Sequence, residues 1–315
     1  MKHGVIISVT SFPARIPYIT PALESILSQR GPDDRVVLWL GKEQFPNAQL
    51  DVPENIRKLS TEGGGKLEIR FVRDTRSFKK LLPALDAFPE NAIITLDDDN
   101  LYPGGVVSKL KEEARRMPGC VLAHCASDLY RVNGRWRRTT GNVGFAIGCP
   151  FLRMQIGGGG VYYPPHSLDP LVMNADLAMK LCPTSDDIWF WFCAVRHGTP
   201  VVRIANGIIR HEMIAAAAGV GALSAINEID DDRVNLQHLR NLLDFDPEVE
   251  RKLLAVCKKN VFKILLLRFV RVLVRYPQQA MFCLRTGGWR FLFCEARRKF
   301  HHFHILMSGK SAEVG

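Results

Sequence analysis

The stretch AIITLDDDNLYP, residues 92–103, decides the fold prediction for this chain. Residues 93–96 are apolar and mostly β-branched, which is typical of a fully buried strand. Asp97, Asp98 and Asp99 follow at once. Burying three carboxylates without a counter-ion is costly, and hard oxygen ligands suit Mg²⁺ or Mn²⁺. An Asp-rich turn capping a helix from Pro103 is the alternative, but the preceding strand favours a metal–diphosphate site at the end of the strand, where open α/β sheets bind ligands.

Strand and helix patterns alternate on both sides of this stretch. Short apolar runs predict strands, and 3.6-residue spacing predicts helices. The predicted strands span 5–10, 35–40, 67–72 and 93–96, and the predicted helices span 19–29, 78–88 and 106–116. Residues 45–62 look irregular. This alternation predicts an α/β fold in which helices cover a parallel sheet.

The second half has a different pattern. Residues 121–137 are rich in strand formers and contain a hairpin signal, Asn133-Gly134. Residues 141–165 look like a loop because four consecutive glycines occupy 157–160. Helices are predicted over 168–181, 188–195 and 235–244, a last strand is predicted over 201–209, and residues 213–227 are hard to assign.

Composition limits the class of protein. The chain has 315 residues, 47% of them hydrophobic, and a formal net charge of +10, which suggests an anionic partner. Its first residues read directly into a strand and do not resemble a secretory signal. The eight cysteines form no Cys-x-x-Cys pair, so we expect mostly buried thiols. We predict a domain over residues 1–245 and a basic helical tail over 246–315.

The tail is basic and amphipathic. Between residues 258 and 299 the only acid is Glu295. Apolar side chains share one side of a helical wheel and cations the other, a pattern of helices that lie on anionic membranes. A helix packed against the main domain is the alternative. Nucleic acid is not expected as a partner, because no recognised binding fold accompanies the charge. The apolar side consists of Val261, Phe262, Leu265, Phe269, Val272 and Leu273.

The ordered set of motifs resembles glycosyltransferases of the GT-A type, within the bacterial polysaccharide-synthesis group. The resemblance covers residues 3–245. It implies a GT-A fold, which is a Rossmann-like, mostly parallel sheet flanked by helices. The motifs are SFPARI (11–16), LESILSQ (23–29), SFKKL (77–81), DDD (97–99), GGVYYPP (159–165) and TSDDIW (184–189).

The resemblance implies a metal site built on an Asp-x-Asp element. It makes Asp99 the expected direct ligand of Mn²⁺ or Mg²⁺, with Asp97 nearer the ribose or the metal. Asp98 would touch the donor sugar. His211 closes the last predicted strand, where related enzymes often place a further metal ligand, although a lone histidine is more often structural.

The resemblance also implies nucleotide contacts. It places Thr10, Ser11 and Arg15 against the nucleotide, just after the first predicted strand. Asp74, at the end of the third strand, would read a base edge, and Lys80 would approach a phosphate as a point charge. Each of these residues could equally be a solvated surface residue.

Asp186 and Asp187 form a second acidic pair. In inverting members of the family such a pair supplies the general base. We assign this role to Asp187, and Asp186 is the alternative. The alternative is a helix N-cap, because the helix dipole favours carboxylates there. Trp189 and Trp191 follow, either as core residues or as sugar contacts.

The function implied is metal-dependent, inverting transfer of a sugar from a nucleotide-diphosphate donor, with UDP expected. A glycan or lipid-linked acceptor in cell-surface polysaccharide synthesis is expected, at the cytoplasmic face of the membrane with an anionic surface as partner. Two alternatives stay open. One is a nucleotidyltransferase that acts on sugar phosphates, and the other is a non-catalytic, membrane-associated assembly protein.

Overall fold

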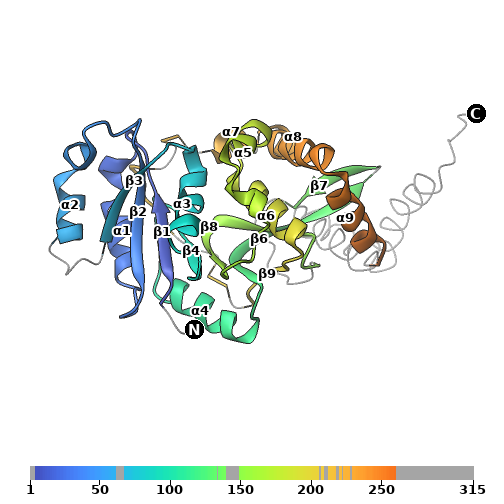
Figure 1. The fold of residues 1–315 in the computed structure, drawn as a ribbon, viewed down its shortest axis with the longest axis horizontal. Coiled ribbons are helices and arrows are strands. Elements are labelled where there is room, and N and C mark those ends of the chain that lie inside the picture. The colour runs from blue at the N-terminus through green and yellow to red at the C-terminus, as the bar shows by residue number, and fades with distance from the viewer. Residues whose placement is uncertain are drawn as a thin grey trace, which may run out of the picture.

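The computed structural model describes residues 4–61, 67–132, 134–139, 149–205, 207–208, 212–217, 220–221, 223–227 and 229–259. One eight-stranded sheet runs through them in the order β3-β2-β1-β4-β8-β6-β7, with β9 paired to β6 (Figure 1). The strands are β1 (Ile6–Thr10), β2 (Arg35–Gly41), β3 (Leu67–Val72), β4 (Ile93–Thr95), β6 (Val121–Val132), β7 (Arg135–Arg138), β8 (Arg153–Tyr163) and β9 (Val201–Arg203).

The predicted parallel sheet is confirmed in the first half of the chain. Strand β1 pairs in parallel with both β2 and β4, and β2 pairs in parallel with β3. Strands β8 and β6 then continue the sheet in antiparallel fashion, and β9 is parallel to β6. Beside the end of β4, β5 (Asn100–Leu101) and β10 (Glu212–Met213) form a small antiparallel pair. The predicted α/β fold with a mainly parallel sheet is therefore confirmed.

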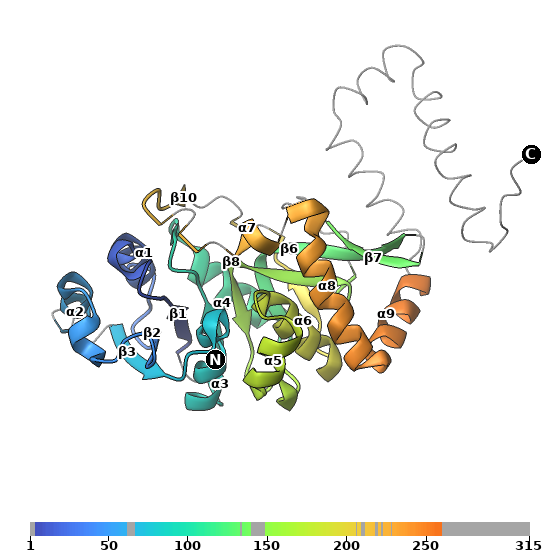
Figure 2. The same ribbon diagram turned by 90° about the horizontal axis from the view of Figure 1, so that it is seen from above.

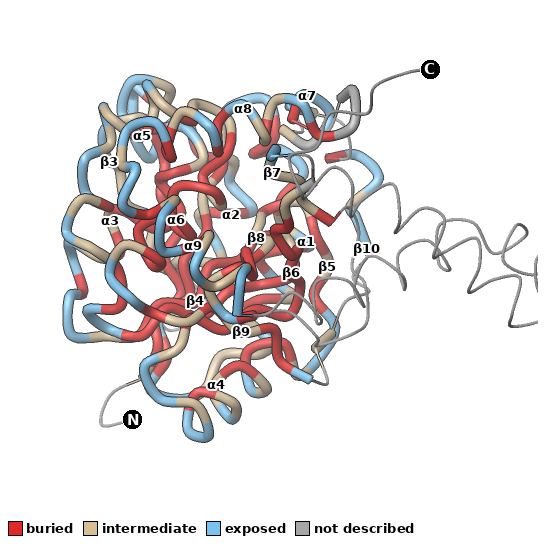
Figure 3. Tube along the Cα trace, turned by 90° about the vertical axis from the view of Figure 1, so that its right-hand side faces the viewer, coloured by how far each residue is buried: buried red, intermediate tan, exposed pale blue. Residues whose placement is uncertain are grey.

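Helices cover both faces of the sheet because successive strand residues point to opposite sides. Ile7 packs in a cluster with α1 (Thr20–Leu27), α2 (Glu54–Thr61) and α4 (Val106–Arg116). The neighbouring Ile6 packs in the cluster on the other face. That face is covered by α3 (Leu82–Ala87), α5 (Ala175–Leu181), α6 (Asp186–His197), α8 (Ile229–Phe245) and α9 (Pro247–Lys259). Figure 3 shows that buried residues are concentrated in the central strands, such as β4, β6 and β8.

Helix α6 is almost entirely core. The exposed fraction of Trp189 and of Trp191 is 0%. The indole N–H of Trp189 donates to the carbonyl of Val172. The expectation that these tryptophans belong to the core is confirmed, and the alternative of a sugar contact is wrong.

The largest error of the sequence prediction lies in the predicted loop 141–165, of which residues 141–148 are outside the described residues. Residues Arg153–Tyr163 form β8, which lies between β4 and β6. A Cβ on Gly159 would lie 2.5 Å from the sulfur of Cys125, and a Cβ on Gly160 would lie 2.8 Å from Leu96. The glycines therefore permit close packing inside a strand, whereas composition alone suggested a loop.

Smaller differences have local causes. Residues 45–62 contain α2, whose Ile56 is buried. The helix predicted over 78–88 begins as a 3₁₀ turn, Arg76–Lys80, and α3 starts only at Leu82, next to Pro83. The strand predicted over 201–209 ends at Arg203, and a turn follows in which the Gly207 N–H donates to Ile204.

The start of the predicted tail is a packed helix. Val249 and Leu253 of α9 are buried in the same cluster as α6 and α8, and the indole N–H of Trp136 donates to Glu250 over 2.9 Å. The basic amphipathic segment from residue 260 onward lies outside the described residues. Within the described part of the chain, no helix is long and apolar enough to cross a bilayer. Several thiols are buried there, as expected: Cys125, Cys149, Cys182 and Cys193.

Candidate active site

A cavity of about 550 Å³ opens where β1, β3 and β4 end. Its walls come from the segments that follow these strands and from the N-terminus of α6. Because the carboxyl ends of parallel strands meet at one edge of the sheet, residues far apart in the sequence converge here. The cavity is lined by most of the predicted site residues: Thr10, Ser11, Arg15, Lys80, Asp97, Asp98, Asp99, Asp186 and Asp187.

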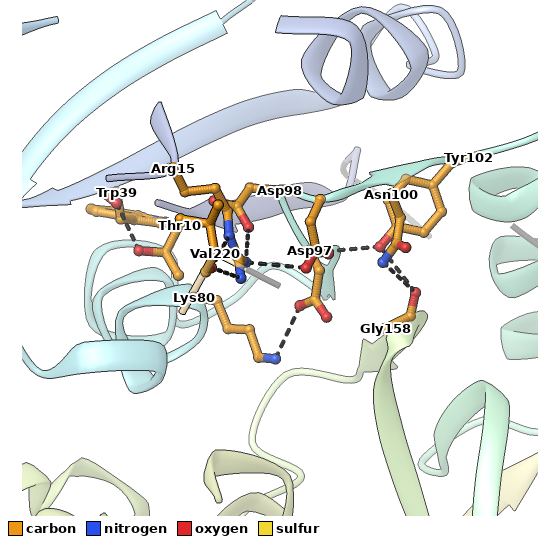
Figure 4. A network of polar contacts seen from close by, with 11 residues as sticks. Thr10, Arg15, Trp39, Lys80, Asp97, Asp98, Asn100, Tyr102, Gly158 and Val220 are labelled. Carbon is orange, nitrogen blue, oxygen red and sulfur yellow. Dashed lines mark hydrogen bonds and ion pairs between the residues drawn. The ribbon is translucent and has the colours of Figure 1, made fainter. Parts of the chain in front are cut away.

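The predicted nucleotide contact Arg15 lies against the acidic triplet. Its Nη1 is 2.7 Å from Oδ1 of Asp98 and 3.2 Å from Oδ2 of Asp99. Its Nη2 donates to the carbonyl of Val220 over 2.7 Å (Figure 4). Asp98 is 3% exposed. Arg15 therefore serves as the counter-ion that a buried carboxylate needs, and it ties the loop at Val220 to the triplet.

The carboxylates of Asp97 and Asp99 fit a divalent cation. Burial and repulsion from Asp97 raise the pKa of Asp99 to about 6. A bound cation would relieve this repulsion. No group of three or more His, Cys, Asp or Glu side chains in the described residues is arranged to hold a metal by itself. Mg²⁺ binds through one or two carboxylates together with substrate phosphates, so Asp97 and Asp99 are the ligands that this chain would supply. The predicted ligand His211 lies outside the described residues.

Tyr102 fixes the backbone of the triplet, and the sequence prediction missed it. The N–H of Asp97 donates to the Tyr102 hydroxyl over 2.8 Å, and that hydroxyl donates to the carbonyl of Gly158 over 3.1 Å (Figure 4). The side chain of Asn100 reaches the same carbonyl. Strand β8 is thereby fastened to the acidic edge. The available signal was the tyrosine within the motif itself, five residues after Asp97.

Lys80 joins the two acidic groups. Its Nζ lies 3.2 Å from Oδ1 of Asp97 and 2.9 Å from Oδ2 of Asp186. The side chain is buried. Although burial opposes the charge, Asp186 and Asp97 raise the pKa of Lys80 well above its ordinary value. Lys80 therefore contributes a fixed positive charge to the lining of the cavity, and its contact with phosphate stays a prediction.

Asp187 has the properties of a general base. Its Oδ2 accepts the N–H of Gly157 over 2.9 Å, whereas its buried Oδ1 has no hydrogen-bond partner among the described residues. Burial, reinforced by Asp186 and opposed by Lys80, raises the pKa of Asp187 to about 7. A base is most effective when its pKa lies near the working pH. Asp186, which is paired with Lys80, is less suited to this role.

The remaining predicted nucleotide contacts divide into two groups. Thr10 and Ser11 line the cavity, and the Thr10 hydroxyl donates to the carbonyl of Trp39 over 2.8 Å. Asp74 is not among the described residues that line it. Its carboxylate instead pairs with Lys79 and accepts the N–H of Arg76. Lys79 itself lines the cavity, so among the described residues Asp74 is linked to the cavity wall through its ion pair with Lys79.

Sequence reasoning missed a polar wall at the far end of the cavity. It is formed by side chains from β7, from the segment before α6, and from α7 (Ser224–Asn227) and α8. No motif marks Arg138, Asn227 or Asn235, and Thr184 and Ser185 belong to the TSDDIW motif, of which only the two aspartates were given a role. The wall consists of Arg138, Thr184, Ser185, Asn227 and Asn235.

Two glycine substitutions in β8 are expected to have different effects. A Cβ on Gly157 would lie 2.6 Å from Nζ of Lys80 and 3.0 Å from Oδ1 of Asp187. Gly157→Ala should therefore displace two cavity side chains and lower kcat at least tenfold, with little change in Tm. Gly159→Ala meets Cys125, including its backbone, and should cost about 1–3 kcal/mol of unfolding free energy. Activity and thermal unfolding of both variants test this; a loss of stability in Gly157→Ala as large as that in Gly159→Ala would contradict it.

Comparisons with known proteins give structural neighbours only. No protein-family model and no curated protein matches the chain. Residues 1–349 of S. aureus TarS, in a crystal structure with UDP, match 64% of this chain and 58% of that one, at 12% identity and a TM-score of 0.44. A second TarS crystal structure matches 77% and 72%, at 11% identity and a TM-score of 0.43. CMP:2-keto-3-deoxy-manno-octonic acid synthetase, complexed with CTP, matches 66% and 93%, at 11% identity and a TM-score of 0.40. TM-scores this low assign the chain to no family and to no activity.

Proposed function

We propose that this chain is a metal-dependent, inverting glycosyltransferase that uses a nucleotide-diphosphate sugar, with UDP as the expected nucleotide. One observation carries the proposal. A buried carboxylate oxygen of Asp187, which has no hydrogen-bond partner in the described part of the chain, shares a cavity with the carboxylates of Asp97 and Asp99. Glycosyl transfer to a hydroxyl needs both elements, a base for the acceptor and a cationic site for the leaving diphosphate.

The reaction requires one bond to form while another breaks. Asp187 takes the proton of an acceptor hydroxyl, and the acceptor oxygen attacks the anomeric carbon of the donor sugar. The bond from that carbon to the diphosphate oxygen breaks, and the nucleoside diphosphate leaves with the electron pair. Attack from the side opposite the leaving group inverts the anomeric centre. The proton remains on Asp187 until it passes to solvent.

The chain's own cations and acids hold the diphosphate. Asp99 and Asp97 would bind Mn²⁺ or Mg²⁺, which supplies Lewis-acid stabilisation of the leaving group when bound. Lys80 and Arg15 add positive charge beside these carboxylates. Lys80 also connects the diphosphate side of the cavity with Asp186, next to the base. Binding of an anionic diphosphate beside Lys80 would therefore change the electrostatic environment of Asp187.

The acceptor and the cellular location are part of the same proposal. We infer a glycan or lipid-linked acceptor in cell-surface polysaccharide synthesis. The basic residues between 258 and 299 would hold the enzyme at the anionic cytoplasmic surface of the membrane. These residues lie outside the described part of the chain, so the proposal for the tail rests on their sequence pattern.

A panel of nucleotide sugars tests the proposed reaction. The purified full chain is incubated with UDP-, GDP-, CMP- and dTDP-sugars in the presence of Mn²⁺ or Mg²⁺, and the released nucleotide is identified by chromatography. Release of a nucleoside diphosphate from one donor, with transfer of its sugar to water while no acceptor is present, is the expected result. With methyl glucoside added as acceptor, the new glycosidic bond should have, by NMR, the anomeric configuration opposite to that of the donor. If the chain instead forms pyrophosphate from a nucleoside triphosphate and a sugar phosphate, it is a nucleotidyltransferase. If it turns over none of these substrates, the assembly-protein alternative gains support.

A further inference from the structure

The wall beyond Asp187, formed by Arg138, Thr184, Ser185, Asn227 and Asn235, will be called the amide wall. Its members line the same cavity as the acidic triplet. Figure 2 shows the elements that carry them, with α7 and α8 close to α6 and β7. None of these five side chains takes part in donor binding as proposed above.

Hydrogen bonds fix the orientation of both amides. Asn227 accepts the Thr184 hydroxyl at Oδ1 over 2.5 Å, and its Nδ2 donates to the Thr184 carbonyl over 2.7 Å. Asn235 accepts the Ser185 hydroxyl at Oδ1 over 2.7 Å, and its Nδ2 donates to Asp232 over 2.8 Å. The carbonyl of Thr184 and the carboxylate of Asp232 can only accept, so they fix Nδ2 of Asn227 and Nδ2 of Asn235 on their sides of the amides.

The donors and acceptors that remain unused determine which ligands the wall can bind. A side-chain amide has two N–H donors and an oxygen with two lone pairs. Each of the two amides uses one N–H and one lone pair in the bonds above. Among the described residues, each amide therefore keeps one N–H donor and one oxygen lone pair for a ligand. A hydroxyl group is itself both donor and acceptor and complements such a pair. A fully ionised phosphate has only acceptor oxygens, so it could use the remaining N–H of each amide but not the remaining lone pair.

The charges on the wall cancel. The guanidinium of Arg138 is held by both carboxylate oxygens of Asp232, over 2.9 Å and 2.7 Å. Asp232 is 2% exposed. His238, which lies 2.8 Å from the Ser185 hydroxyl, has its pKa lowered by burial and is neutral at pH 7. Within the described residues, this side of the cavity therefore offers no uncompensated charge, in contrast to the acidic edge at Asp97.

We propose that the amide wall binds an uncharged, polyhydroxylated acceptor unit, a sugar or an alditol, and discriminates against a phosphorylated one. The wall would hold this unit with one hydroxyl at Asp187. The proposal rests on the proposed function, because it names the acceptor class for that reaction, but the binding preference exists whether or not a donor is turned over.

Matched probes test the proposal directly. Methyl glucoside and sorbitol are compared with their 6-phosphates, first as ligands of the full chain by saturation-transfer NMR and then as acceptors with the donor found in the panel. The uncharged probes should bind and be glycosylated, with KM at least tenfold lower than that of the phosphates. Equal or better use of the phosphates would overturn the proposal.

Three variants locate the preference. Asn227→Ala and Asn235→Ala each remove a wall amide and should raise the acceptor KM about tenfold relative to the donor KM, since a lost hydrogen bond has roughly this effect. Asn241→Ala is the control, because Asn241 lies on α8 but its amide donates to Leu181 away from the cavity. If all three variants bind the uncharged probes as the wild type does, the wall is not the subsite. If the probes bind as expected but no donor is consumed, the subsite stands and the proposed function fails.

Discussion

Replacing Asp187 with Asn is expected to lower kcat by about 10²–10⁴-fold, the usual contribution of a well-placed general base. The variant keeps the size of the side chain, and its amide oxygen can still accept the N–H of Gly157. It cannot accept a proton from the acceptor hydroxyl. Acceptor and donor KM should therefore change much less than kcat, because the loss falls on the transition state.

The pH dependence gives a second readout for Asp187. Burial, reinforced by Asp186, raises the pKa of Asp187 to about 7. A base works only when ionised, so the wild-type kcat should rise with pH up to about 7 and level off above it. Below that pKa the rate should fall about tenfold for each pH unit. In Asp187→Asn this acid limb should disappear together with most of the rate.

Two further variants make the Asp187 assignment specific. Asp186→Asn removes a partner of Lys80 and should have a smaller effect with the acid limb retained. Asp176→Asn alters an exposed carboxylate that pairs with Arg73 and should behave as the wild type. A larger loss in Asp186→Asn than in Asp187→Asn would transfer the role of base to Asp186.

The sequence predicted the acidic edge of the site because local pattern and topology agree there. A buried apolar run followed by three carboxylates allows few structures other than a central strand that ends at a ligand site. Thr10 and Lys80 were proposed from the family resemblance, and the structure brings both to the same cavity, Thr10 at the end of β1 and Lys80 in the turn that follows β3. Where an alternating pattern predicts the ends of the strands, residues that are distant in the sequence can be predicted to lie at the same edge of the sheet.

The pattern failed where long-range contacts decide the structure. Gly157 and Gly158 lie in the interior of β8, although glycine disfavours strands. The reason for Gly157 is visible only in the fold, because a Cβ there would meet Lys80 and Asp187. No local rule reports a steric conflict between residues that are 30 to 77 positions apart in the chain.

The amide wall was missed for a related reason. Asn227 and Asn235 belong to helices α7 and α8, and their sequence neighbours show only ordinary helical signals. Each becomes distinctive through its partner on the segment before α6, Thr184 for Asn227 and Ser185 for Asn235. The sequence singled out that segment for its carboxylates alone, so the pairing of hydroxyls with amides appeared only in the structure.

Replacing Asp99 with Ala is expected to lower the metal-dependent rate by about 100-fold or more, since losing ~3 kcal/mol of leaving-group stabilisation has this effect. The carboxylate lines the cavity beside Asp97. Excess Mn²⁺ should restore part of the rate, because Asp97 and the donor phosphates still offer ligands. Asp86→Ala, on the exposed side of α3, is the control for removal of a carboxylate and should keep the wild-type rate.

The affinity of the wild type for Mn²⁺ should itself depend on pH. Burial and repulsion from Asp97 raise the pKa of Asp99 to about 6, and a proton competes with a metal for the same oxygen. Titration of Mn²⁺ in the presence of the nucleoside diphosphate should therefore show tight binding above pH 6 and weakening below it, and this dependence should be largely lost in Asp99→Ala. A wild-type chain that keeps its full rate in EDTA, matched by Asp99→Ala, would contradict the metal site. The positive charge facing the diphosphate would then have to come from Arg15 and Lys80, which already lie against the same carboxylates.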